Sequence, residues 1–130
     1  MERIVIVLDT SALIFWTLDP NRLSTLAVES IVEAKRKVVS SISIWEIGLK
    51  VKQGKIKIPL PVIEYVEKLK TVEGMEIVPV DERTWLKNLE LDWDHKDPAD
   101  RTIVATAMLL SIPLVTSDRI IRQFYAETVW

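Results

Sequence analysis

Cysteine is absent from this 130-residue chain, and histidine occurs only once. The sequence therefore has no disulfide framework, no thiolate metal site and no thiol nucleophile. Glycine is also scarce, with 3 residues. Neither Gly-x-Gly-x-x-Gly nor Gly-x-x-x-x-Gly-Lys-Ser/Thr occurs, so the phosphate cradles of dinucleotide-binding and P-loop proteins are missing. The Gly-x-Ser-x-Gly elbow of serine hydrolases is missing too. Any chemistry must come from oxygen or nitrogen ligands.

Long apolar runs are lacking as well. The longest are Ile4–Leu8 and Ala12–Trp16, far short of the 18 or more residues of a spanning helix, and Asp9 interrupts any signal-peptide core. We expect no membrane segment and a cytoplasmic location. With 48% apolar and 28% charged residues, the composition is that of an ordinary folded protein, and the length predicts one domain over residues 1–130.

The net charge is close to zero, but its distribution is uneven. Residues 35–57 hold seven basic residues and one acid, and residues 73–100 hold nine acids and three basic residues. Such runs are commonly solvated surface. The alternative is a basic rim for a polyanion beside an acidic pocket for a cation.

Alternating patterns predict an α/β fold with three layers, in which helices cover both faces of a mostly parallel sheet. The first strand, Arg3–Leu8, is apolar throughout, as expected for a strand that is buried on both faces. Further strands are expected at 38–41, 76–80, 113–116 and 127–130, and helices at 11–16, 24–37, 43–51, 61–72, 81–90, 97–110 and 120–124. In such sheets ligands bind beyond the carboxyl ends of the strands.

Four acidic residues are expected at that edge. Asp9 and Asp118 directly follow apolar strands, while Glu46 and Asp100 fall in the first turns of two predicted helices. Each has a plainer interpretation as a turn or helix-capping residue, and Ser43 with Glu46 matches a capping box. Four ordinary caps, however, need not share one edge of a sheet.

If the four acids do converge, a cation is needed. Like charges about 5 Å apart repel by roughly 3 kcal/mol at an effective dielectric near 20, so some acids must protonate or bind a metal ion. Carboxylates and water suit Mg²⁺ or Mn²⁺ better than Zn²⁺, which prefers His or Cys. Such an ion polarises phosphoryl oxygens and activates water, as phosphodiester hydrolysis requires.

The sequence resembles the PIN-domain nucleases, and within them the VapC-type ribonuclease toxins of toxin–antitoxin pairs. The resemblance covers nearly the whole chain and is carried by four segments in order: Leu-Asp9-Thr-Ser-Ala, Ser-Ile-Ser-Ile-Trp-Glu46-Ile, Asp-Pro-Ala-Asp100-Arg-Thr-Ile-Val-Ala-Thr-Ala and Leu-Val-Thr116-Ser-Asp118. It implies an α/β/α fold and metal-dependent endonucleolytic cleavage of single-stranded RNA.

The resemblance also implies roles for individual residues. Asp9 is the central metal ligand, Asp100 and Asp118 complete the pocket, and Glu46 serves a second ion or positions water. Asp97 lies three residues before Asp100 and is the alternative ligand. Hydroxyls that orient the carboxylates, or else cap local turns, are Thr10, Ser11 and Thr116.

Several residues around this set have open interpretations. The single histidine, His95, either contacts substrate or is an ordinary surface or hydrogen-bonded residue. Trp16 and Trp45 are expected in the core or facing a partner. The lysines expected to contact RNA phosphates, if they are not simply solvated, are Lys50, Lys52, Lys55 and Lys57.

The apolar first helix suggests an interface for a homodimer or for an antitoxin. Two alternatives to the nuclease remain: a noncatalytic PIN-like module that binds RNA or protein, and a hydrolase of small phosphoesters.

Overall fold

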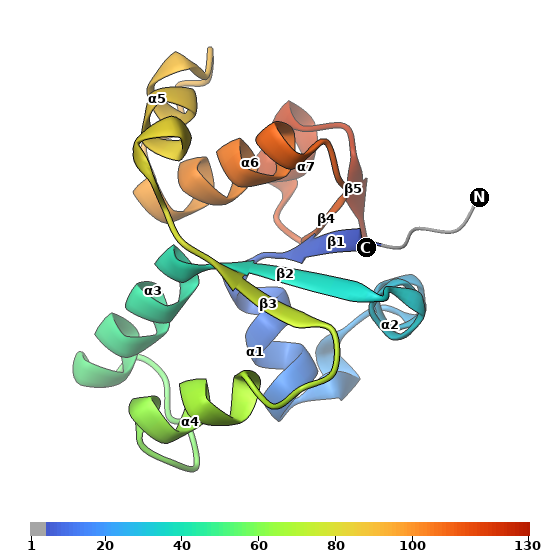
Figure 1. The fold of residues 1–130 in the computed structure, drawn as a ribbon, viewed down its shortest axis with the longest axis vertical. Coiled ribbons are helices and arrows are strands. Elements are labelled where there is room, and N and C mark those ends of the chain that lie inside the picture. Colours follow the sequence, from blue (N-terminus) through green and yellow to red (C-terminus); the bar gives the residue numbers. More distant parts are fainter. Residues whose placement is uncertain (1–4) are drawn as a thin grey trace.

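The structure is a computed structural model, and it describes residues 5–130. Within this range the strands form one parallel sheet in the order β3-β2-β1-β4-β5 (Figure 1). The strands are β1 (Val5–Leu8), β2 (Arg36–Ser40), β3 (Met75–Val78), β4 (Leu114–Val115) and β5 (Thr128–Val129). The predicted α/β sheet is confirmed. Arg3 and Ile4, the first residues of the predicted first strand, lie outside the described residues.

Helices cover both faces of the sheet, as the three-layer prediction requires. Figure 1 shows α1, α3 and α4 on one side and α5, α6 and α7 on the other. The helices are α1 (Thr10–Leu18), α2 (Thr25–Glu33), α3 (Ser41–Lys52), α4 (Val62–Leu69), α5 (Glu82–Glu90), α6 (Pro98–Leu110) and α7 (Arg119–Phe124), with a short 3-10 turn at Pro20–Arg22.

The first strand divides the core into two layers. Ile6 and Leu8 pack into a cluster with residues of α1, α2, α3 and α4, whereas Val7 packs with residues of α6 and α7. All three side chains are fully buried. Because both faces of the sheet are covered, this strand is apolar throughout and does not alternate between apolar and polar residues.

The helix predicted for 61–72 ends at Leu69, and two further predicted boundaries are wrong. The helix predicted for 24–37 ends at Glu33, and Arg36 and Lys37 belong to β2. Lys37 is paired with Ile6 of β1 and donates its backbone N–H to the carbonyl of Gly74. Pairing with two neighbouring strands thus overrides the local helical pattern.

The second of these two boundaries concerns α3. The helix begins at Ser41, and its cap is Ser40, whose hydroxyl accepts a hydrogen bond from the N–H of Ile42. The alternative interpretation of Ser43 and Glu46 as a capping box is therefore wrong, because Ser43 lies inside the helix. Glu46 falls in the second turn of the helix, and its side chain is free to face the edge of the sheet.

No helix within residues 5–130 has the length and apolarity needed to cross a membrane.

Candidate active site

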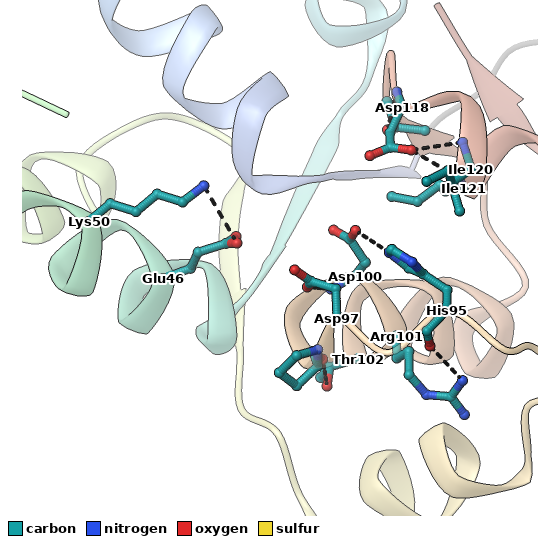
Figure 2. Close-up of polar contacts among 12 residues, drawn as sticks. Glu46, Lys50, His95, Asp97, Asp100, Arg101, Thr102, Asp118, Ile120 and Ile121 are labelled. Atoms are coloured by element: carbon teal, nitrogen blue, oxygen red, sulfur yellow. Dashed lines mark hydrogen bonds and ion pairs between the residues drawn. The ribbon is translucent and has the colours of Figure 1, made fainter. Parts of the chain in front are cut away.

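A cleft of about 290 Å³ lies at the carboxyl ends of the central strands. Glu46, Asp97, Asp100 and Asp118 face a common space from three different helices (Figure 2). The complete lining is Asp9, Thr10, Ser11, Glu46, Lys50, Asp97, Asp100, Ser117 and Asp118. The structure therefore brings together the four acids that were predicted to converge.

Asp9 is the most deeply placed of these acids. It caps α1 directly after β1, and its Oδ1 accepts a hydrogen bond from the N–H of Ala12 at 2.8 Å. Burial raises the pKa of Asp9 from 3.8 to about 6; hydrogen bonds from Thr116 and Ala12 oppose the rise, and the charges of Asp100 and Asp118 add to it. The charges of the neighbouring acids thus disfavour the ionised form of Asp9, and a bound cation would stabilise that form.

Asp118 enters the cleft from the other central strand. It follows β4 and caps α7, because its Oδ1 accepts from the N–H groups of Ile120 and Ile121. Its own N–H donates to the hydroxyl of Thr116 at 3.1 Å. Thr116 is fully buried and hydrogen-bonds to Asp9 as well. The predicted orienting role of this threonine is consistent with its contacts to both acids.

Asp97 and Asp100 stand at the start of α6. Asp97 is the cap, and its Oδ1 accepts from the N–H of Asp100 at 2.9 Å. Asp100 is less exposed, and its Oδ2 lies 2.8 Å from Nε2 of His95 (Figure 2). Burial raises the pKa of Asp100; the hydrogen bond from His95 opposes this, and the charges of Asp97 and Asp118 add to it. Asp100 is therefore the better placed of the two for a role in the cleft.

Glu46 reaches the cleft from α3. Its Oε2 lies 3.7 Å from Nζ of Lys50, one helical turn further on (Figure 2). Lys50 is the one basic residue among those that line the cleft. The ammonium group of Lys50 therefore lies in a cleft that is lined by five carboxylates.

Two hydroxyls next to Asp9 differ in their surroundings. Thr10 is buried, and its Oγ1 lies 2.8 Å from Oγ of Ser43 in α3. Ser11 is exposed and lines the cleft. Thr10 therefore ties two helices together, whereas Ser11 is open to a ligand.

The donor set fits a hard divalent ion, since it consists of carboxylates and hydroxyls without thiolates. Within residues 5–130, no three Asp, Glu or His side chains are already gathered as a ligand group. Two of the acids have side-chain partners in the metal-free protein: Oδ2 of Asp100 is bonded to His95, and Glu46 is paired with Lys50. Mg²⁺ keeps several waters and needs only one or two direct carboxylates, so the cleft fits such an ion with water completing its shell.

The remaining predicted residues lie outside the cleft lining. Lys52, Lys55 and Lys57 are exposed beyond Lys50, at the end of α3 and in the following loop. Trp16 is half-buried against the core, and Trp45 is 57% exposed. Of the four lysines predicted to contact RNA, one thus borders the acids.

Sequence reasoning missed the network around the 91–96 loop. Arg101 donates to the carbonyl oxygens of Asn88, Leu91, Trp93 and His95. The interpretation of His95 as a hydrogen-bonded residue is confirmed, but its partner, Asp100, was not anticipated. The available signal was that His95 lies five positions before Asp100 in the sequence.

Comparison with known proteins gives consistent matches. The PIN domain model matches residues 6–127. The chain is 31% identical to Ribonuclease VapC22 of Mycobacterium tuberculosis over 129 residues, covering 96% of this chain and 98% of that protein.

Solved structures with the same fold include a toxin–antitoxin complex from Klebsiella pneumoniae (TM-score 0.68, 18% identity, 96% of both chains). Another is VapBC2 from Rickettsia felis bound to a DNA fragment from their promoter (TM-score 0.67, 15% identity, 97% of this chain and 99% of that one).

Proposed function

Because the chain belongs to the PIN domain family, we propose that it is a metal-dependent endoribonuclease that cleaves single-stranded RNA, and the toxin of a toxin–antitoxin pair. The observation that carries the proposal is the meeting of Asp9, Glu46, Asp100 and Asp118 in one cleft. The similarity to Ribonuclease VapC22 supports the same activity.

In this proposal Asp9, Asp100 and Asp118 hold Mg²⁺ or Mn²⁺, directly or through water. The bound ion supplies Lewis acidity toward phosphoryl oxygens and lowers the pKa of its water. The pKa of Asp9 is raised mainly by burial and further by the charges of Asp100 and Asp118. A cation bound there would offset both effects, which supports the proposed site.

The other residues of the cleft orient these groups. Glu46 lies across the cleft on α3, where its carboxylate accepts a hydrogen bond from the attacking water and directs it to the phosphorus. Thr116 holds Asp9 and the backbone of Asp118. Lys50 attracts a phosphate of the RNA backbone to the edge of the acidic cleft.

The exposed lysines after Lys50 extend this attraction. Lys52, Lys55 and Lys57 follow within one turn and a short loop, and each can contact a further phosphate of a flexible single strand. They contribute affinity rather than sequence selectivity, because phosphate contacts read no bases.

An antitoxin would dock on the apolar first helix. A groove of about 480 Å³ runs between α1 and α4, lined in part by Trp16, Leu18, Leu60, Tyr65 and Leu69. Its apolar surface suits one face of an amphipathic segment. The solved toxin–antitoxin complex of the same fold supports such a partner.

We place the toxin and its antitoxin in the cytoplasm.

A homodimer is also proposed, with its interface on a different surface from the one the sequence suggested. The exposed apolar side chains Trp45, Trp85, Leu86 and Leu89 lie on α3 and α5. When large apolar side chains are exposed together, burying them against a second copy of the chain is favourable. None of these four residues lines the groove between α1 and α4.

The test is cleavage of single-stranded RNA with Mg²⁺ or Mn²⁺ by the wild type and Asp9→Asn. We expect metal-dependent cleavage that falls at least about 100-fold in the variant. Equal activity in both proteins would end the proposal. Turnover of small phosphoesters without RNA cleavage would instead select a phosphohydrolase, and absence of both activities a noncatalytic binding module.

A further inference from the structure

His95 contacts an acid of the cleft without being one of its lining residues. Its Nε2 lies 2.8 Å from Oδ2 of Asp100, and the two side chains are only 20% and 22% exposed. An ionised carboxylate can only accept, so the imidazole N–H donates. The contact occupies one oxygen of Asp100 and leaves the other free.

The backbone of the loop that carries His95 is fixed by Arg101. The guanidinium donates to the carbonyl of His95 at 3.1 Å (Figure 2). It also donates to the carbonyl of Trp93. It further donates to the carbonyl and side-chain oxygens of Asn88 in α5. Arg101 directly follows Asp100 in α6. The residue that holds the loop is therefore the neighbour of the residue that carries the carboxylate.

The imidazole ring is fixed independently by aromatic packing. Its centroid lies 4.8 Å from the ring of Trp93, which stacks on Phe124 at 4.5 Å with an interplanar angle of 6°. Phe124 is the last residue of α7, the helix that Asp118 caps. The position of the ring is therefore tied to the helices that carry both acids.

We propose that His95 is a positioning residue, whose bond to Oδ2 of Asp100 fixes this carboxylate so that Oδ1 is presented to the cleft. The consequence for RNA cleavage rests on the proposed function; the consequence for cation binding does not. Partners of ligating groups that orient them commonly change metal affinity or activity about 10–100-fold when removed.

The first experiment examines the contact itself. His95 is the only histidine of the chain, so the imidazole nitrogens give an unambiguous ¹⁵N NMR signal. Asp100→Ala is expected to shift the Nε2 signal and to expose its proton to rapid exchange. Asp94→Ala, which removes an exposed acid next to His95, is the control and should leave it in place.

The second experiment compares His95→Ala, His95→Gln and the exposed-loop control Lys96→Ala in the full chain. Arg101 holds the loop through backbone carbonyls, so removing the imidazole should preserve the fold, which the melting temperature checks. We expect His95→Ala to weaken Mn²⁺ binding, followed by electron paramagnetic resonance, and to lower kcat, each about 10–100-fold, with little change in KM.

His95→Gln should restore most of both quantities, because its amide also donates a hydrogen bond, and Lys96→Ala should match the wild type. An Nε2 signal that ignores Asp100→Ala overturns the proposal. Equal Mn²⁺ affinity of the wild type and His95→Ala also overturns it. The same holds if neither protein binds Mn²⁺ detectably. A wild type that binds Mn²⁺ but cleaves no RNA contradicts the proposed function alone.

Discussion

The hydroxyl of Thr10 lies 2.8 Å from the hydroxyl of Ser43, and both residues are buried. This contact joins the first turn of α1, which Asp9 caps, to the first turn of α3, which carries Glu46 one turn later. Two acids 37 positions apart in the chain are thereby held at a fixed separation across the cleft.

Removing one of these hydroxyls should destabilise the protein. Ser43→Ala leaves the hydroxyl of Thr10 buried without its partner, which costs about 1–3 kcal/mol. Adding Thr10→Val removes the stranded group, so the double variant should lose less than the sum of the single losses. Urea unfolding of the four proteins measures this coupling. Strictly additive losses would show that the two hydroxyls do not interact.

The stability of the metal-free protein should depend on the ionisation of Asp9. Its pKa is raised from 3.8 to about 6 in the folded state, so the folded protein binds more protons than the unfolded chain between these values. Stability is therefore lost as pH rises through this window, by up to about 3 kcal/mol. Asp9→Asn keeps a capping oxygen and should be more stable than the wild type at pH 8 but similar at pH 4.

Asp81 provides the matched control. It caps α5, and hydrogen bonds from Thr84 lower its pKa, so its stabilising effect is present at neutral pH and is lost on acidification. Asp81→Asn should therefore be less stable than the wild type at pH 8. Thermal unfolding at both pH values measures the two differences. If Asp9→Asn were, like Asp81→Asn, less stable than the wild type at pH 8, the prediction that burial destabilises the ionised form of Asp9 would be wrong.

Lys50 should contribute to RNA affinity. It lines the acidic cleft beside Glu46, and Lys50→Gln is expected to raise KM several-fold and to reduce the slope of log affinity against log salt by about 0.7, the value for one phosphate contact on a single strand. Lys70 pairs with Glu67 near the end of α4, so Lys70→Gln is the control. Equal salt slopes for the two variants would exclude this contact.

The sequence was informative where structure is decided locally. Asp81 and Asp97 were predicted as the starts of helices and are the caps of α5 and α6, because a capping carboxylate acts on N–H groups within three residues. Asp9 and Asp118 were placed by the ends of apolar strands, and the parallel sheet brings such ends to one edge.

It was uninformative where distant segments decide the outcome. Ser43 matches a helix cap in pattern, yet the hydroxyl of Thr10, 33 residues away, is its partner inside the fold. Lys37 continues a helical pattern but is drawn into β2 by pairing with β1. The bond between His95 and Asp100 depends on a loop that Arg101 folds, and no periodic pattern encodes such a loop.

The most direct test of the account is anomalous diffraction from crystals of the wild type soaked in Mn²⁺. We predict an anomalous peak in the cleft among Asp9, Asp100 and Asp118, and its loss in crystals of Asp9→Asn. A peak that persists in the variant, or a wild-type cleft that stays empty at millimolar Mn²⁺, would contradict the claim that these acids assemble to hold a divalent ion.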